Sequence, residues 1–134
     1  MLPEKPLATS KARAVLPLTY ERADVVANLQ SVAMLGLAFA QGRGDLLQAA
    51  MSDRIHQPYR ASICPQLPRL LPLAGNHGVT GVALSGAGPA VLVVLDGVQS
   101  VAKASAAIHA ALEGMSAPEL LTCCFEPKGA CLRI

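Results

Sequence analysis

In the first half of the chain, apolar positions recur at steps of three and four residues, the period of a helix. Helices are predicted over residues 9–16, 20–41, 45–55 and 65–76. The second of these is apolar nearly all round in its carboxyl half, so we expect it to be deeply buried. In the fourth, Pro72 should bend or shorten the helix, because proline lacks a backbone donor.

In the second half of the chain the pattern changes to runs of apolar and β-branched residues, which are typical of strands. Strands are predicted over residues 79–84, 90–95, 120–125 and 130–133. An alanine-rich helix is predicted among them, over residues 100–115. The first two strands are joined by a short loop, so they must be antiparallel neighbours.

This order of elements predicts the α+β class, as a ferredoxin-like βαββαβ sandwich with an antiparallel sheet and additional helices. The first strand is largely missing, because only residues 1–4 are available for it. That strand is central in the ferredoxin-like order, and a sheet without it has unpaired edges. We therefore expect an upstream segment or a partner chain to take its place.

Composition narrows the function classes. Hydrophobic residues make up 52% of the chain, which excludes a disordered protein and gives one domain of 134 residues a core. Aromatic residues are only 3%, and the eleven Lys and Arg form no basic run, so nucleic acid is not an expected partner. The longest apolar run, residues 31–40, is about half of what a membrane span needs, so no membrane is expected.

The chain has four cysteines, Cys64, Cys123, Cys124 and Cys131, which lack the spacing of a zinc site. We expect them to be reduced and mostly buried, which suits the cytoplasm. No metal site is predicted. The first six residues do not have the pattern of a signal peptide.

One candidate site is the loop Ser85-Gly86-Ala87-Gly88-Pro89 between the first two strands. Its glycines permit positive φ and let a ligand touch the backbone. Successive exposed N–H groups can then form a nest that binds an anion. The alternative is a tight hairpin connection without a ligand.

The densest polar stretch is Asp-Arg-Ile-His-Gln-Pro-Tyr-Arg, residues 53–60. Pro58 should hold Gln57 in an extended conformation. Mixed donors and acceptors at this density favour a binding segment over a simple loop. The alternative is a helix cap followed by a surface turn, with His56 as a hydrogen-bonded structural residue.

Thr9 and Arg13 are four residues apart, and therefore lie on one face of the first predicted helix. An arginine fork in apolar surroundings can grip a carboxylate with two hydrogen bonds. The alternative is an arginine on a solvated face.

Taken in order, these stretches resemble the homoserine kinase family. The resemblance rests on residues 9–17, 22–24 with Asn28, 53–60 and 84–89, and the stretches 56–60 and 85–89 are especially similar. The glycine loop alone would fit the wider superfamily of galactokinase, homoserine kinase, mevalonate kinase and phosphomevalonate kinase. The resemblance covers nearly all of this chain but only the C-terminal part of the family's length.

The resemblance implies that ATP, with Mg²⁺, phosphorylates the side-chain hydroxyl of L-homoserine on the route to threonine. It implies that Thr9 and Arg13 line the substrate site and that Arg13 and Arg60 bind the carboxylate. Gly86 would border the substrate and phosphate region. His56, Ser85 and Gly88 are expected to support these residues.

The family's phosphate-cradling glycine-serine loop has no counterpart in this sequence. We therefore expect no catalytic residue within the chain, and we expect ATP and Mg²⁺ to be held mainly by a missing N-terminal domain. The chain alone should be inactive. Alternatives are another kinase of the superfamily, a non-enzymatic amino-acid-binding module, and a dimerisation domain that forms homodimers.

Overall fold

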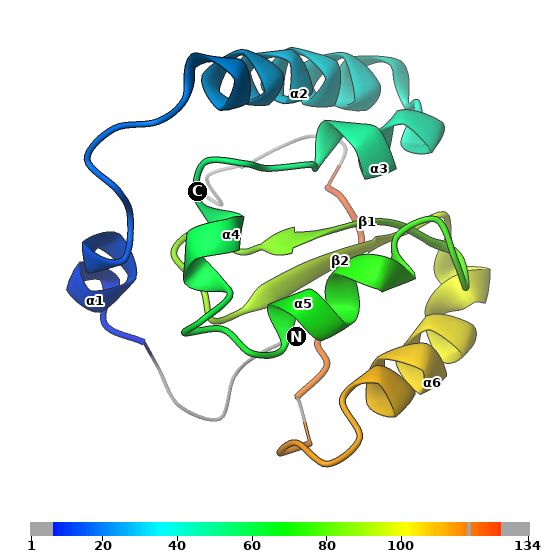
Figure 1. The fold of residues 1–134 in the computed structure, drawn as a ribbon. Coiled ribbons are helices and arrows are strands. Elements are labelled where there is room, and N and C mark those ends of the chain that lie inside the picture. Colours follow the sequence, from blue (N-terminus) through cyan, green and yellow to red (C-terminus); the bar gives the residue numbers. More distant parts are fainter. Residues whose placement is uncertain (1–6, 118, 127–134) are drawn as a thin grey trace, which may run out of the picture.

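The structure is a computed structural model and describes residues 7–117 and 119–126 (Figure 1). The helices are α1 (Thr9–Ala14), α2 (Arg22–Gln41), α3 (Leu47–Ala50), α4 (Gln57–Arg60), α5 (Leu67–Leu70) and α6 (Val101–Ala111). Single 3₁₀ turns precede or follow three of them, at η1 (Gly44–Leu46), η2 (Leu71–Leu73) and η3 (Val98–Ser100). The strands are β1 (Val79–Leu84) and β2 (Val91–Leu95).

The two strands form an antiparallel hairpin, as predicted. Val79 pairs with Leu95 at one end and Leu84 with Val91 at the other. The register shifts between Val79 and Gly81, which is an irregularity of the β-bulge kind. A Cβ at Gly81 would lie 2.2 Å from the Met51 sulfur, so the Met51 side chain packs directly over the strand at this glycine.

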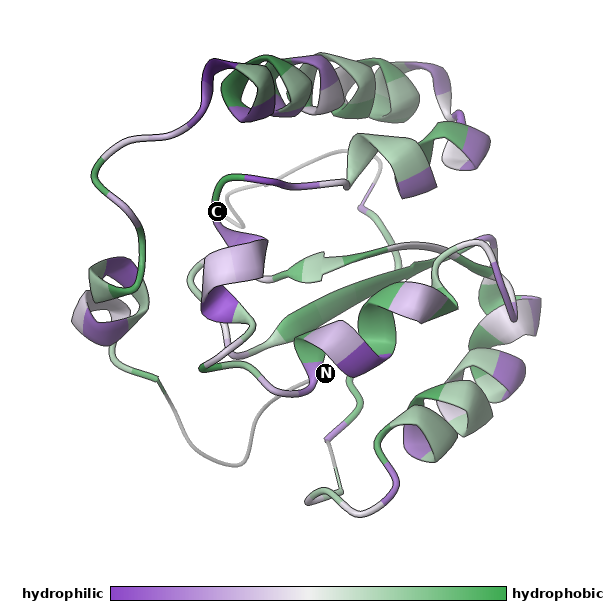
Figure 2. Ribbon diagram, viewed as in Figure 1, coloured by the Kyte–Doolittle hydropathy of each residue, from purple (hydrophilic) through white to green (hydrophobic). Residues whose placement is uncertain are grey.

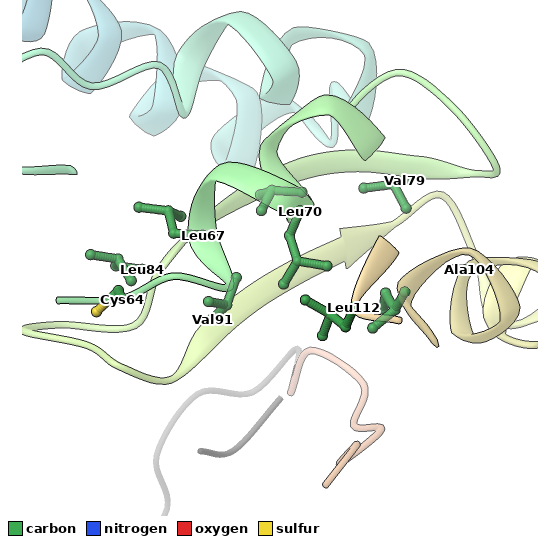
Figure 3. Close-up of a cluster of buried hydrophobic side chains, with 10 residues drawn as sticks. Cys64, Leu67, Leu70, Val79, Leu84, Val91, Ala104 and Leu112 are labelled. Atoms are coloured by element: carbon green, nitrogen blue, oxygen red, sulfur yellow. The ribbon is translucent and has the colours of Figure 1, made fainter. Parts of the chain in front are cut away.

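Helices cover both faces of the hairpin (Figure 1). The larger cluster joins β1 and β2 to α5 and α6, and Figure 3 shows these side chains meeting between the elements. Its buried members are Cys64, Leu67, Leu70, Val79, Val82, Leu84, Val91, Ala104, Ile108 and Leu112. A smaller cluster of Ala38, Leu47 and Val94 joins α2 and α3 to the other face. The α+β class with an antiparallel sheet is therefore confirmed.

The prediction that α2 is deeply buried is wrong. Ala38 is its one buried residue, whereas Leu29 and Val32 are each 65% exposed. Figure 2 shows apolar residues in green along this helix. Polar and apolar residues share the half-buried positions, whereas much of the apolar surface is exposed. The half-buried residues are Asp24, Val25, Ala27, Asn28, Ser31, Met34 and Leu35, and the exposed apolar ones include Val26, Leu29, Ala33, Leu37 and Ala40. Apolar positions indicate that a surface is to be covered, but they do not say which element covers it.

By length and composition alone, α2 also passes for a membrane-crossing helix. A single helix of this kind is weak grounds for a membrane protein, because buried core helices and signal sequences have the same length and composition. In this fold Asn28 ties α2 to the segment before α4.

Other predicted elements change in extent. Residues 120–125 do not form the predicted strand and have no regular secondary structure. The helix predicted to run to residue 55 ends at Ala50. α5 ends at Leu70 and η2 contains Pro72, so the predicted shortening by proline is confirmed. The strand predicted over 130–133 and the partial strand over 1–4 lie outside the described residues.

We predicted from Pro58 that Gln57 is extended. This prediction is wrong, because Gln57 is the first residue of α4. Proline is tolerated in the first turn of a helix because its missing N–H would have no intrahelical partner there. The expectation for the cysteines also needs correction. Cys64 is buried, but Cys123 and Cys124 are exposed, and Cys131 lies outside the described residues.

Candidate functional site

Asp53 holds the amino-terminal end of α4. Its Oδ2 accepts hydrogen bonds from the backbone N–H groups of His56 at 3.0 Å and Gln57 at 2.5 Å. Its Oδ1 accepts from Asn28 Nδ2 at 2.6 Å. The carboxylate therefore satisfies two free amides of the helix start and links them to α2.

These contacts decide the charge of Asp53. Burial by itself would raise the pKa of this carboxyl, but the hydrogen bonds from Gln57, Asn28 and His56 outweigh burial and hold the pKa below its ordinary value. Asp53 is therefore ionised at neutral pH, and its negative charge lies at the positive end of a helix dipole.

Arg60, at the other end of α4, is 8% exposed and joins three segments. Its Nε donates to the carbonyl of Ala12 in α1 at 3.2 Å. Its Nη1 donates to the carbonyl of Gly86 in the glycine loop, also at 3.2 Å. The same Nη1 lies 3.2 Å from Nδ1 of His56, one helical turn earlier.

His56 is the acceptor in its contact with Arg60. Burial lowers the pKa of the imidazole below its ordinary value, the nearby Asp53 charge opposes this, and the Arg60 charge adds to it. The ring is therefore neutral at pH 7. Its Nε2 lies 3.7 Å from Asp53 Oδ2, and a proton on Nε2 leaves Nδ1 free to accept from Arg60.

The Arg60 charge has no acidic partner in the part of the chain that the structure describes. The ion pairs there are Arg43–Asp45, Arg54–Asp24 and His56–Asp53. The Nε and Nη1 protons of Arg60 are used, and its Nη2 has no acceptor among residues 7–117 and 119–126. A buried cation is costly without a counter-ion, so this guanidinium is suited to an anionic ligand.

The glycine loop offers backbone donors near this cation. Gly86 has φ +61° and Gly88 has φ +80°. The N–H of Ser85 donates to Ala90 and that of Gly88 to Ser85. Within the described residues, the adjacent amides of Gly86 and Ala87 have no acceptor. Two neighbouring free amides are what an anion-binding nest requires.

Gly88 is the more constrained glycine of the loop. A Cβ there would lie 3.0 Å from the Cys64 sulfur and 3.2 Å from Leu84 Cδ2. A Cβ at Gly86 would have no other atom within 4 Å. The loop is therefore packed on the core at Gly88 and open at Gly86.

The structure brings together only some of the predicted site residues. Arg60, His56 and Gly86 are in direct contact. Arg13 and Thr9 are exposed on α1, and the α1 carbonyl that accepts from Arg60 belongs to Ala12. No three His, Cys, Asp or Glu side chains of the described ranges gather as a metal site.

Two further residues build the site. Asp53 is the helix cap that the alternative interpretation of residues 53–60 allowed, whereas sequence reasoning missed Gln57, which is buried with its side chain against β1. For Asp53 a signal was present, because an acidic residue shortly before Pro58 fits a helix start. Nothing local marked Gln57 as buried.

The fold and this constellation define the class of protein. Residues 37–114 match the family model described as "GHMP kinases C terminal". The match covers more than half of the chain, and the chain belongs to this family.

The curated relatives narrow the similarity. The chain is 52% identical over 96 residues to homoserine kinase of Deinococcus radiodurans, covering 72% of this chain and 31% of that protein. It is 47% identical over 102 residues to homoserine kinase of Schizosaccharomyces pombe, covering 72% and 30%. The chain therefore spans about a third of the length of these relatives.

A solved structure supports the fold. The crystal structure of homoserine kinase from Cytophaga hutchinsonii superposes with a TM-score of 0.73 at 24% identity. The superposition covers 81% of this chain and 35% of that protein.

Proposed function

We propose that this chain is the C-terminal, substrate-binding part of a homoserine kinase, contributing to ATP-dependent phosphorylation of the L-homoserine hydroxyl in threonine biosynthesis in the cytoplasm. The observation that carries the proposal is Arg60, a buried guanidinium without an acidic partner among the described residues, beside two free loop amides. The similarity to homoserine kinases supports the choice of substrate.

In this proposal Arg60 and Arg13 bind the amino-acid carboxylate. Arg60 is already oriented by Ala12, Gly86 and His56, so little side-chain entropy is lost when the ligand arrives. Thr9 lines the same pocket from α1, and Gly86 borders the substrate and the phosphate. Ser85 and Gly88 shape the loop. Phosphoryl transfer depends mainly on such positioning and on electrostatic stabilisation.

The described residues offer ATP few contacts and offer Mg²⁺ no cluster of carboxylates. The Gly86 and Ala87 amides can contact a phosphate oxygen, whereas no cluster of carboxylates in the described ranges is suited to Mg²⁺. When bound, these groups supply the transferred phosphoryl and neutralise its charge. We assign most of their binding to the remaining part of the kinase, and we expect no turnover by the chain alone.

The exposed apolar side of α2, made of Val26, Leu29, Ala33, Leu37 and Ala40, supports a partner for this domain. We assign it to the remaining two thirds of the kinase, since the relatives are about three times as long. The portion of the Deinococcus radiodurans enzyme outside the match should bind the wild-type chain. Leu29→Glu should abolish binding, and Val98→Glu, at an exposed position on another face, should not.

Calorimetry with L-homoserine tests the binding site. Arg60→Leu should lose about 1.5–3 kcal/mol of binding free energy, the value of a hydrogen bond to a charged group, and Arg13→Ala should lose a similar amount. Arg69→Ala is the control, because Arg69 donates to the Glu113 carbonyl away from the site. Unchanged affinity in both Arg60→Leu and Arg13→Ala would contradict the carboxylate role.

The same exposed side of α2 favours a second candidate, a non-enzymatic module that forms homodimers. Sedimentation separates the two proposals. A stable dimer of the isolated chain that dissociates in Leu29→Glu would support the dimerisation module, whereas a monomer that binds the rest of the kinase would support the first proposal.

A further inference from the structure

Gln57 is a buried polar residue that the proposed carboxylate site does not use. It is 4% exposed, and its Oε1 accepts a hydrogen bond from the backbone N–H of Leu84 at 2.9 Å. Leu84 is the last residue of β1 and immediately precedes the glycine loop. The contact therefore joins the start of α4 to the point where the strand becomes the loop.

The amide of Leu84 lies on the open edge of the hairpin. Successive amides of a strand point to opposite edges, and Ser85 N–H donates to Ala90 on the β2 side. Leu84 N–H therefore points away from β2. Among the described residues no further strand pairs with β1. The Gln57 side chain provides the acceptor that a neighbouring strand would otherwise supply.

Gln57 is itself held in place. Its backbone N–H donates to Asp53, which also binds Asn28 of α2. One turn further along, Arg60 donates to Gly86. The short helix α4 is thus attached to β1 and its loop at two points, Gln57 to Leu84 and Arg60 to Gly86, and its amino-terminal end is attached to α2.

We propose that Gln57 is a positioning residue that sets the glycine loop against Arg60. It makes no contact with substrate in this role and acts through Leu84. The proposal rests on the proposed function only where homoserine affinity is the readout. Without the Gln57 oxygen, Leu84 N–H would be buried without a partner, which a protein relieves by moving the strand end. Such a movement would displace the Gly86 carbonyl from Arg60.

The test compares three variants of the full chain. Gln57→Leu removes the acceptor, and Gln57→Glu keeps an oxygen at the same distance along the side chain. Gln48→Leu is the matched control, because Gln48 is exposed and donates to the Ala74 carbonyl far from the loop. Thermal unfolding first establishes a temperature at which all variants are fully folded. Should Gln57→Leu fail to fold, Gln57→Asn replaces it, since it withdraws the oxygen by one bond.

The first readout needs no ligand. Amide hydrogen exchange followed by NMR should be at least about tenfold faster at Leu84 in Gln57→Leu than in wild type, with backbone shifts at Gly86 and Ala87. Exchange in α6 should be unchanged, Gln57→Glu should restore slow exchange at Leu84, and Gln48→Leu should match wild type. Unaltered exchange at Leu84 in Gln57→Leu would overturn the proposal.

The second readout is L-homoserine affinity, which should fall about tenfold in Gln57→Leu and recover in Gln57→Glu. Full affinity in Gln57→Leu alongside faster Leu84 exchange would refute a role in positioning the site. Absence of binding by the wild-type chain would count against the proposed function, and the exchange measurement would still decide whether Gln57 holds the loop.

Discussion

Arg60 and Gly86, which are 26 residues apart in the sequence, are joined by a hydrogen bond of 3.2 Å from the guanidinium Nη1 to the backbone carbonyl. The amides of Gly86 and Ala87 have no acceptor among the described residues. The contact therefore holds the buried cation of α4 against the glycine loop.

Replacing Arg60 by lysine should destabilise the domain even without ligand. A lysine cannot make the contacts to Ala12, Gly86 and His56 together, because they need the planar guanidinium. We expect the free energy of unfolding in urea to fall by about 1–3 kcal/mol. Arg69→Lys is the control, with a change below about 0.5 kcal/mol expected at its exposed contact. Equal stability of the two variants would contradict this account of Arg60.

The two glycines of the loop should respond differently to alanine. Gly86→Ala has space but must adopt φ +61°, so it should cost about 1–2 kcal/mol. Gly88→Ala has the same backbone penalty and also crowds Cys64 and Leu84, so it should cost about 2–4 kcal/mol in thermal unfolding.

A double-mutant cycle tests how much of the destabilisation by Gly88→Ala comes from crowding of Cys64. Cys64→Ala combined with Gly88→Ala should be about 1 kcal/mol more stable than the two single changes predict by addition. Strict additivity would show that the Cys64 sulfur is not what opposes the new methyl group.

Asp53→Asn should destabilise the chain most at neutral pH. The variant has a single acceptor oxygen, whereas Asp53 accepts from His56 N–H, Gln57 N–H and Asn28. The expected loss is about 1–3 kcal/mol at pH 7. Since the pKa of Asp53 is lowered in the folded state, its stabilisation is complete above about pH 4 and is lost as pH falls through the folded pKa.

Urea unfolding of wild type and Asp53→Asn between pH 7 and pH 2 measures how the stabilisation by Asp53 depends on pH. The difference between the two proteins should shrink below about pH 4. Asp45→Asn, at an exposed carboxylate that pairs with Arg43, should show little difference at any pH. A difference that stays constant down to pH 2 would mean that Asp53 is not the titrating group.

His56 should make stability depend on pH in a higher range. Its pKa is lowered in the folded state, so its contribution is present above about pH 6.5 and is lost as pH falls through the folded pKa. Protonation would remove the acceptor at Nδ1 and place a second cation beside Arg60. His56→Asn should flatten the decline of unfolding free energy between about pH 6.5 and pH 5. An identical decline in His56→Asn and wild type would contradict this.

Much of the local structure could be predicted. The hairpin, the long helix that became α2 and the core of α6 follow from spacing alone, because each is specified by residues close together in the sequence. The grouping of Arg60, His56 and Gly86 was expected from the resemblance to homoserine kinases, and the structure brings these three into contact. The substrate roles of Thr9, Arg13, Arg60 and Gly86 stay predictions.

Other features depended on partners distant in the sequence. Residues 120–125 have the composition of a strand, but a strand exists only where a neighbour accepts its hydrogen bonds. Apolar positions marked α2 as a helix that needs cover, and packing decided that Asn28 faces Asp53 while Leu29 faces out. The burial of Gln57 and its bond to Leu84 required α4 to meet the end of β1. The sequence by itself determined the periodic elements and the residues able to bind an anion, because those depend on local spacing and side-chain chemistry. Only tertiary structure decided which of those residues meet, because burial and hydrogen bonding arise between segments brought together by folding.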